Sequence, residues 1–173
     1  MRVQIRKAAP EDADALAALG AETFIDTFGA LYSKKNLNAF LEKNHTANVY
    51  RAMIDNPQFG IFIAESEASA AIGYAVAGPC GLPVPNLPPR SGELGRLYMK
   101  PGMQGGGVGA RLLDAALAFM SDRYDHIYLS VYSENYGAQR FYERFGFVKI
   151  HDHFYMVGDQ ADPDWIMELK RDQ

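Results

Sequence analysis

The feature that most constrains this chain is a cluster of glycines followed directly by an amphipathic helix pattern. Residues 104–111 read Gln-Gly-Gly-Gly-Val-Gly-Ala-Arg, so four glycines fall in five positions. Glycine permits tight turns and close backbone approach because it has no Cβ. The first N–H groups of a helix lack intrahelical partners and attract anions. The pattern therefore predicts a phosphate-binding loop, with a flexible glycine-rich turn as the alternative.

Length and composition limit the remaining possibilities. The 173 residues predict one domain over 1–173. The net charge of −4 and the lack of a basic cluster argue against nucleic-acid binding. No segment approaches the ~20 apolar residues of a membrane span, so we expect no membrane association and a cytoplasmic location. Cys80 is the only cysteine and the four histidines show no metal-ligand spacing, so we expect no metal.

The first part of the chain predicts one strand and then helices. Apolar and polar residues alternate over 2–6, which indicates a strand. Pro10 opens a helix whose apolar stripe continues towards Phe28. Ser33 and Thr46 are suitable N-caps for two shorter helices.

The middle of the chain changes to a strand pattern. Residues 59–65 and 72–77 predict a hairpin. Residues 78–92 hold five prolines and predict a long loop, either functional or a passive connector. Residues 93–99 predict a further strand, in which Gly95 indicates a bulge or a close approach.

The part that follows the glycine cluster predicts further alternation of helices and strands. The expected elements are a helix over 108–119, a strand over 127–131, a helix from Ser133 or Asn135 to Gly146, and closing strands over 147–150 and 165–169. The order predicts a mixed α/β (α+β) fold with an antiparallel meander before the glycine loop.

Three segments at these separations resemble one enzyme family. Residues 104–109 fit a Q/R-x-x-G-x-G/A signature. Residues 133–147 contain Asn135, then Ala138, then Tyr142 and an aromatic-Gly-Phe turn. Residues 93–99 resemble the strand before the signature. Together they resemble the GCN5-related N-acetyltransferases (GNAT family), over nearly the whole chain. The resemblance implies the GNAT fold, with a mixed, mostly antiparallel sheet of about seven strands flanked by helices.

The resemblance also implies acetyl-CoA as co-substrate. The backbone of the glycine loop would surround its pyrophosphate, and the pantetheine arm would lie where the strands diverge near Gly95 and Tyr132. The residues assigned to acetyl-CoA in this way are Leu97, Tyr98, Met99, Gln104, Gly105, Gly106, Gly107, Val108, Gly109, Ala110, Asn135, Ala138 and Tyr142.

Two residues are candidates for proton transfer by the same resemblance. Tyr142 is the candidate acid for the CoA thiolate, although its spacing from Phe145 also suits an aromatic core cluster. Glu93 is the candidate base, acting through water, with an exposed strand carboxylate as the alternative. Asn135 would bind the pantetheine arm, and it also suits a helix N-cap.

The acceptor is the least defined part of the prediction. Glu22 and Asp26 are four residues apart and share a helix face, so they either receive an ammonium group or form a solvated acidic face. Segments 22–29 and 158–167 are similar to bacterial PaiA-type acetyltransferases, some of which act on polyamines. We therefore expect a small amine acceptor, with a polyamine among the candidates. The resemblance further implies a homodimer.

Other functions compete with this interpretation. Gly105, Gly107 and Ala110 fit a variant dinucleotide-binding motif, but too few residues follow for further βα units. No Lys-Ser/Thr pair follows the last glycine, which excludes a P-loop. An acyl-CoA-binding regulator without turnover, or acetylation of a protein or peptide N-terminus, remains as the alternative.

Overall fold

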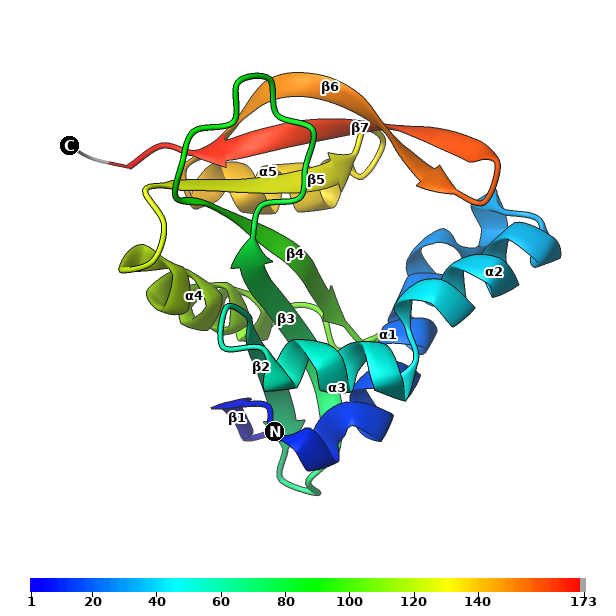
Figure 1. The fold of residues 1–173 in the computed structure, drawn as a ribbon. Helices are drawn as coiled ribbons and strands as arrows, with labels where there is room; N and C mark the ends of the chain where they lie inside the picture. The colour runs from blue at the N-terminus through cyan, green and yellow to red at the C-terminus, as the bar shows by residue number, and fades with distance from the viewer. Residues whose placement is uncertain (172–173) are drawn as a thin grey trace.

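The computed structural model describes residues 1–171 and contains a central seven-stranded sheet (Figure 1). The strand order is β1-β2-β3-β4-β5-β7-β6. The strands are β1 (Val3–Lys7), β2 (Gly60–Ser66), β3 (Ala71–Pro79), β4 (Ser91–Met99), β5 (His126–Tyr132), β6 (Phe147–Val157) and β7 (Gln160–Leu169). Only the β4–β5 pair is parallel. The predicted mixed, mostly antiparallel sheet of about seven strands is confirmed.

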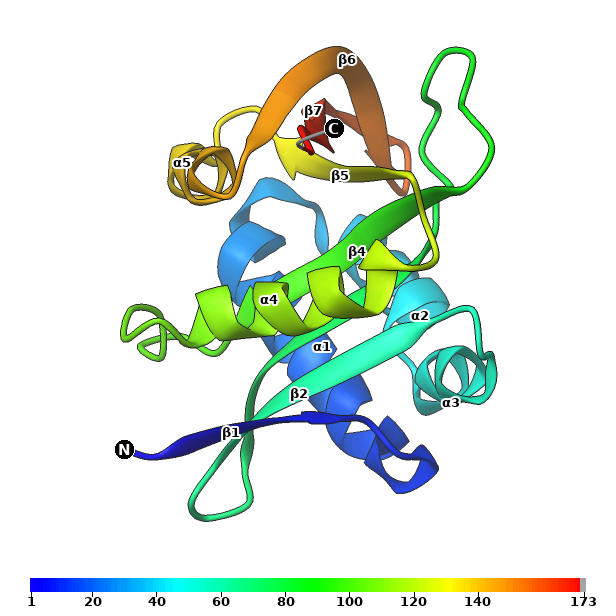
Figure 2. The same cartoon turned by 90° about the vertical axis from the view of Figure 1, so that its left-hand side faces the viewer.

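Helices lie on both sides of the sheet (Figure 2). They are α1 (Ala13–Phe28), α2 (Lys34–Asn44), α3 (Ala47–Asp55), α4 (Val108–Ser121) and α5 (Tyr136–Arg144), with short 3-10 turns at Pro10–Asp12 and Gly29–Leu31. Helix α4 crosses one face, and α1 and α3 lie on the other (Figure 2). Within residues 1–171, none of these helices is long and apolar enough to span a bilayer.

The helix starts follow from their capping residues. Ser33 Oγ accepts the N–H of Asn36 at 3.1 Å, and Thr46 Oγ1 accepts the N–H of Val49 at 3.3 Å. Each bond satisfies an N–H group that has no intrahelical partner. The predicted starts of α2 and α3 are therefore confirmed. These caps place α2 and α3 beside α1, where they help to form one wall of the cavity described below.

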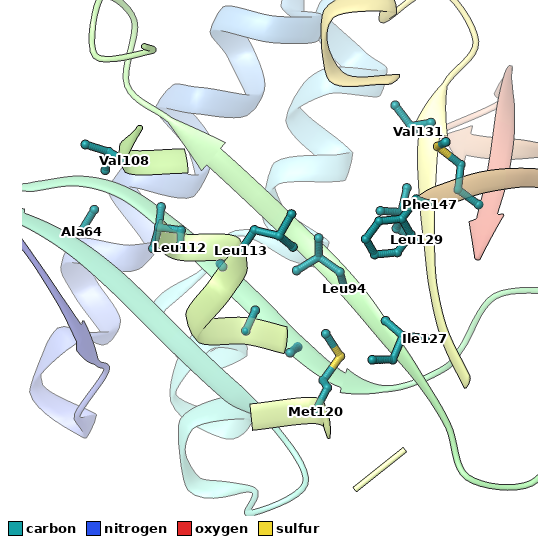
Figure 3. Packing of buried hydrophobic residues seen from close by; sticks show 14 of the residues in the cluster. Ala64, Leu94, Val108, Leu112, Leu113, Met120, Ile127, Leu129, Val131 and Phe147 are labelled. Atoms are coloured by element: carbon teal, nitrogen blue, oxygen red, sulfur yellow. The ribbon is translucent and has the colours of Figure 1, made fainter. Parts of the chain in front are cut away.

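Helix α4 anchors the glycine loop to the sheet. Its apolar stripe of Leu112, Leu113 and Met120 is fully buried against β2–β4 (Figure 3). Full burial of one such side chain contributes about 1.5–3 kcal/mol. Val108 opens the same stripe, so the helix N-terminus is fixed next to the end of β4.

The sheet opens between β4 and β5. The two strands pair only over Ser91–His126, Gly92–Ile127 and Glu93–Tyr128, and then they diverge (Figure 2). The β3–β4 register shifts at the same place, because Val76 pairs with Arg96 whereas Ala77 pairs with Leu94. Gly95 is the extra residue, so the predicted bulge is confirmed. Beyond Glu93 the side of β4 that faces β5 has no partner strand within residues 1–171.

The closing strands are longer than the sequence predicts. The expected strands 147–150 and 165–169 are in fact Phe147–Val157 and Gln160–Leu169. A bulge shifts the register between Lys149 and His151, which breaks the alternation that predicts strands. Residues 162–164 read Asp-Pro-Asp, a composition typical of turns, yet they lie inside β7. The long hairpin reaches α2, where Asn36 Nδ2 donates to Asp159 Oδ1 at 2.7 Å.

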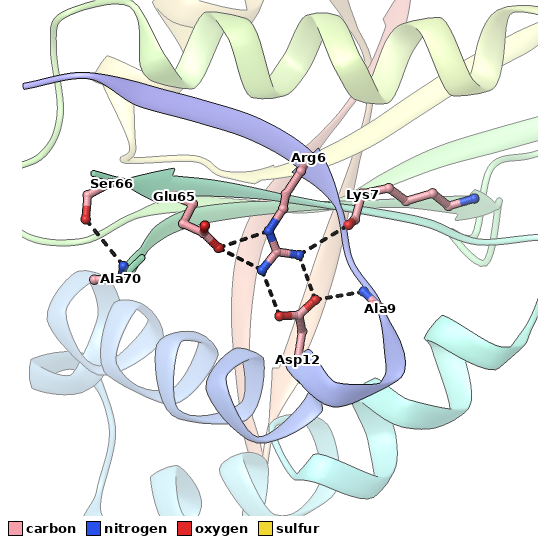
Figure 4. A network of polar contacts seen from close by, with 7 residues as sticks. All are labelled: Arg6, Lys7, Ala9, Asp12, Glu65, Ser66 and Ala70. Atoms are coloured by element: carbon pink, nitrogen blue, oxygen red, sulfur yellow. Dashed lines mark hydrogen bonds and ion pairs between the residues drawn. The ribbon is translucent and has the colours of Figure 1, made fainter. Parts of the chain in front are cut away.

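A charged network joins the first two strands to the start of α1 (Figure 4). The Arg6 guanidinium donates to both Asp12 oxygens at 2.8 and 2.9 Å. Its Nε and Nη2 donate to Glu65 Oε2 at 2.9 and 2.8 Å. The Ala9 N–H also donates to Asp12. The bond from Arg6 lowers the pKa of Asp12 below 3.8, with a smaller contribution from Ala9.

We expect Arg6→Met to lower the free energy of unfolding by about 1–2 kcal/mol, because charge-assisted bonds are lost from a partly exposed site. Arg2→Met on the same strand is the matched control, since Arg2 is exposed. Denaturant unfolding measures both variants. The lowered pKa of Asp12 means that the network stabilises the fold above pH 3.8 and loses this effect in stronger acid. The difference in the free energy of unfolding between Arg6→Met and wild type must therefore become smaller in acid. A difference that does not change with pH would contradict this stabilising role of the network.

Candidate active site

A single cavity of about 890 Å³ occupies the opening between β4 and β5. Its lining includes the glycine loop and the start of α4, the diverging strands, α5, an aromatic wall on α1 and α2, the β6–β7 hairpin and part of the proline-rich loop. Phe24, Phe28 and Phe40 belong to that wall, and Phe24 stacks on Phe40 with centroids 4.4 Å apart. The cavity thus extends from the glycine loop to this aromatic wall.

The glycine loop has the geometry of an anion cradle. Gly105, Gly106 and Gly107 have φ values of 90°, 64° and 78°, which side-chain-bearing residues rarely adopt. A Cβ at any of the three would meet nothing within 4 Å. Glycine is therefore needed here for the backbone conformation and not for lack of space, and the loop surface stays open. No carbonyl among residues 1–171 accepts the N–H groups of residues 104–107. These N–H groups and the N-terminus of α4 are available to a phosphate.

The predicted loop residues do not all face the cavity. Its lining includes Gln104, Gly105, Gly107, Gly109 and Ala110. The Val108 side chain instead packs in the core with α4, and Gly106 lies outside the lining. Their part in binding an anion would be through the backbone.

The end of β4 lies along the cavity. Leu97, Tyr98 and Met99 all belong to its lining. Leu97 and Met99 pack towards α4, and Tyr98 stacks on Tyr74 on the opposite face with centroids 6.0 Å apart. Because β5 has left, backbone N–H and C=O groups on this edge can pair with an extended ligand, as an added strand would.

Helix α5 brings the second predicted motif to the cavity. Asn135 Oδ1 accepts the N–H of Ala138 at 3.3 Å, so the N-cap interpretation of Asn135 is confirmed. Asn135 and Ala138 both line the cavity. Gln139, one residue further, is buried and donates to the carbonyls of Tyr132 and Ser133, which holds the start of α5 against the end of β5.

Tyr142 points from α5 into the cavity. Its ring packs edge-on against Phe141 and Phe147, with centroids 5.3 and 5.8 Å away. Both the aromatic cluster and the cavity position expected from the sequence are therefore present. The hydroxyl has no hydrogen-bond partner within residues 1–171 and is not sealed from solvent, so it opens to the cavity. Burial raises the pKa of Tyr142, which keeps this hydroxyl protonated.

Glu93 lies at the last paired position before the strands diverge. Its Oε1 accepts the N–H of Gly81 at 2.9 Å, so the proline-rich loop holds the carboxylate in place. Burial raises the pKa of Glu93, although the Gly81 bond and the charge of Arg96 act in the opposite direction. Glu93 is thus a half-buried carboxylate at the cavity, which disagrees with the exposed-carboxylate alternative. The loop predicted over 78–92 is shorter, because residues 78–79 belong to β3 and residues 91–92 to β4. The remaining loop, 80–90, contacts Glu93 through Gly81 and is thus more than a passive connector.

Arg96 is a cavity residue that the sequence analysis missed. Its Nη1 donates to the Asn44 carbonyl at 3.0 Å and to Tyr50 Oη at 2.8 Å. Tyr50 Oη also bonds His45 and Tyr74. Burial lowers the pKa of His45 to about 3, with a contribution from Arg96, so His45 is neutral. The only sequence signal was the position of Arg96 directly after the bulge glycine.

Two further acids line the cavity from β7, and these too were missed. Asp162 and Asp164 are 5% and 8% exposed. Ser130 Oγ lies between Asp164 Oδ2 at 2.8 Å and His153 Nε2 at 2.7 Å. The Asp162 carboxylate accepts the Tyr32 hydroxyl. Burial raises the pKa of Asp164 to about 6, and Asp162 adds to this while the Ser130 bond opposes it.

Glu22 and Asp26 do not lie where the resemblance implied. Both side chains are exposed, and neither belongs to the cavity lining. Glu22 instead lies 3.6 Å from Lys100 Nζ. The α1 stripe that faces the cavity passes through Phe24, Thr27 and Phe28, because these positions lie on the other side of the helix from the acidic pair. The acidic pair therefore matches the solvated-face alternative, and the cavity acids are Glu93, Asp162 and Asp164.

Metal-binding geometry is not found in the described part of the chain, where no group of three or more His, Cys, Asp or Glu side chains converges. His153 bonds Ser130, and His126 lies 3.3 Å from Glu168, so these two histidines already have protein partners. Cys80 is half-buried, and burial raises the pKa of its thiol to about 11, with a smaller contribution from Glu93. A thiol of this kind is a poor nucleophile at neutral pH.

Comparison with known proteins establishes the family. The sheet order, with two strands that splay beside a glycine loop, is that of the N-acetyltransferase fold. A sequence profile described as "Acetyltransferase (GNAT) family" matches residues 23–147. This match covers well over half of the chain, so the chain belongs to the GNAT family. It is an acetyl-CoA-dependent N-acetyltransferase, as the family assignment and its N-acetyltransferase relatives indicate.

The relatives are distant in sequence and similar in length. An uncharacterized N-acetyltransferase of Mycobacterium tuberculosis is 28% identical over 157 residues, 90% of this chain and 96% of the relative. One from Lactobacillus delbrueckii subsp. lactis is 25% identical over 167 residues, 96% of each. Among solved structures, the PaiA N-acetyltransferase of Thermoplasma acidophilum in complex with coenzyme A gives a TM-score of 0.78 at 24% identity, covering 99% of this chain and 100% of that one. At this identity the structural likeness concerns the fold.

Proposed function

We propose that this protein transfers the acetyl group of acetyl-CoA to the amine of a small molecule, by direct attack in a ternary complex. The observation that carries the proposal is the single cavity that joins the glycine loop, the unpaired edge of β4, Glu93 and Tyr142. A donor with a pyrophosphate at one end and a thioester at the other suits such a cavity. The coenzyme A bound by the Thermoplasma neighbour supports the same ligand class.

The donor is bound mostly by backbone groups. The unpaired N–H groups over 104–107 and the N-terminus of α4 receive the pyrophosphate. The pantetheine amides pair with the free edge of β4 near Leu97 and Met99, and Asn135 and Ala138 contact this arm from α5. An N–H on the same edge faces the thioester oxygen, where a preorganised donor is worth about 2.7–4 kcal/mol in the transition state.

Proton transfer is divided between two residues at the acceptor end. An aliphatic ammonium has a pKa of about 10.4 and must lose a proton before it can attack. Glu93 accepts this proton through a water molecule, and its raised pKa brings it closer to the operating pH. The neutral amine nitrogen then bonds to the acetyl carbon, the C–S bond breaks, and Tyr142 Oη donates a proton to the departing thiolate. The second proton that the attached nitrogen loses as the amide forms restores the Tyr142 hydroxyl.

Charge in the cavity supports an amine acceptor. The buried Asp162 and Asp164 and the half-buried Glu93 place negative charge at this end, which attracts an ammonium group. The sequence resemblance adds polyamines as candidates. The cavity also favours an enzyme over a regulator, because a protein that only bound acyl-CoA would not need both a carboxylate and an unbonded tyrosine hydroxyl in the lining.

The proposal is tested by thiol release from acetyl-CoA over a panel of amino acids, monoamines, polyamines, aminoglycosides and peptide N-termini. We expect turnover with at least one small amine, and saturable dependence on both substrates as a ternary complex requires. Mass spectrometry of the product confirms acetylation. Binding of acetyl-CoA without turnover on any acceptor would contradict the proposal and favour the regulator.

We expect Tyr142→Phe to lower kcat by about 10²-fold or more, because the thiolate then leaves without its acid. The ring and its packing remain, so affinity for acetyl-CoA by calorimetry should hardly change. Tyr136→Phe, at an exposed site on the same helix, is the matched control and should retain full activity. Unchanged turnover in Tyr142→Phe would remove this residue as the acid.

We expect Glu93→Gln to lower kcat/KM by about 10²-fold or more at neutral pH. The wild-type rate should fall as pH drops through the raised pKa of Glu93, because the protonated carboxyl cannot accept a proton. In the variant the rate should instead follow the fraction of acceptor present as free amine. The ratio of wild-type to variant kcat/KM should therefore become smaller at high pH. The exposed Glu67→Gln controls for loss of charge. If kcat/KM of Glu93→Gln and of wild type changed with pH in the same way, Glu93 would not be the base.

A further inference from the structure

The Nε and Nη2 groups of the Arg96 guanidinium have no hydrogen-bond partner within residues 1–171. Both of its hydrogen bonds, to Asn44 and to Tyr50, start from Nη1. Neither Nε nor Nη2 bonds any atom of residues 1–171. No side-chain nitrogen or oxygen in that part of the chain is both sealed from solvent and unpartnered. Nε and Nη2 therefore open to the cavity that Arg96 lines.

The open edge is the one that binds carboxylates. Nε–H and Nη2–H of an arginine point the same way and form a planar fork that matches a carboxylate. Arg6 uses the same two atoms to hold Glu65, at 2.9 and 2.8 Å (Figure 4). In Arg96 the fork is presented to the cavity with no protein carboxylate in it.

Arg96 forms no ion pair within residues 1–171. Glu93 is near enough for the charge of Arg96 to oppose the rise of its pKa but lies beyond ion-pair distance, and the groups that interact most strongly with Arg96 are Tyr50, Tyr74 and Tyr155. Burial opposes the charge, but interactions with Tyr50 and Tyr74 outweigh it and raise the pKa of Arg96. An unpaired buried charge is costly, so an anion that enters this site gains a strong interaction.

The bulge brings this fork next to the reacting centre. Leu94 packs towards α4, whereas Glu93 pairs with Gly78 and faces the opposite side of the sheet. The extra residue Gly95 turns Arg96 to the same side as Glu93. The proposed base and the open guanidinium therefore lie on one face of β4, on either side of a single kink.

We propose that the acceptor is an amine that carries a carboxylate close to its reactive nitrogen, as an amino acid does, and that the Nε–Nη2 edge of Arg96 binds this carboxylate. This inference rests on the acetyltransferase function proposed above. A polyamine would leave the fork empty and bring a second cation towards Arg96. A zwitterion satisfies both signs of charge in the cavity, with its carboxylate on Arg96 and its amine towards Glu93.

The wild-type enzyme gives the first test. Each amino acid is compared with its own carboxamide, which keeps the amine and side chain and removes the negative charge. The two are compared at a pH above the pKa of both amines, because the amide lowers the pKa of the amine and both must be equally free of protons. For the best acceptor we expect kcat/KM to be at least about tenfold higher than for its amide, as the loss of a charge-assisted fork implies.

Variants of Arg96 give the second test. Arg96→Met should lower kcat/KM for the amino acid by about tenfold to a hundredfold, leave the amide rate within about threefold, and so abolish the preference. Arg96→Lys keeps the charge without the fork and should show an intermediate preference. Arg123→Met, at an exposed arginine outside the cavity, is the matched control. Thermal unfolding reports whether loss of the Asn44 and Tyr50 bonds has disturbed the fold.

The outcomes separate the two proposals. Acetylation of amides, monoamines or polyamines at rates equal to or above those of every amino acid would overturn the role of Arg96 and leave the acetyltransferase function standing. An equal loss of rate for both members of each pair in Arg96→Met would also overturn that role, since a purely structural residue has this effect. Absence of transfer to any amine would overturn the proposed function itself.

Discussion

The structure depends on one unpaired strand edge. Strands β4 and β5 share three residue pairs and then separate, so backbone groups of β4 beyond Glu93 face a cavity in place of a neighbouring strand. Backbone N–H and C=O groups are strong hydrogen-bonding groups, and leaving them unpaired is costly. Such an edge is retained where a ligand completes it. The glycine loop lies at one end of this edge and the Gly95 bulge at the other, and in the proposed binding mode they limit where that ligand begins and ends.

The cavity has two ends with different physical character. At the glycine loop the available groups are backbone N–H groups and a helix N-terminus, which can bind a phosphate without the help of particular side chains. At the other end the groups are charged side chains that are held in place: Glu93 by Gly81, Asp164 by Ser130, and Arg96 by Tyr50. Acetyl-CoA, the donor that the whole family shares, needs only the end at the glycine loop. We propose that the second end, where charges of both signs occur, selects the acceptor.

The sequence was most informative where function acts through the backbone. The glycine run, the Gly95 bulge and the Asn135 cap each have a local residue signature, and each was found in the predicted place. The acceptor end was predicted poorly, because its side chains come from β4 and β7, which are distant in sequence. The bulge in β6 and the Asp-Pro-Asp segment hid the long hairpin that carries Asp162 and Asp164. Glu22 and Asp26 share a helix face, but periodicity alone could not say which face met the cavity.

The most direct test of the central claim is the structure of this protein with coenzyme A bound. The account predicts pyrophosphate oxygens within hydrogen-bond distance of the N–H groups in the 104–110 loop. It also predicts a pantetheine arm that pairs with the free edge of β4 at Leu97 and Met99 and ends between Glu93 and Tyr142. Coenzyme A bound elsewhere, or with its pantetheine arm outside the opening between β4 and β5, would contradict the account.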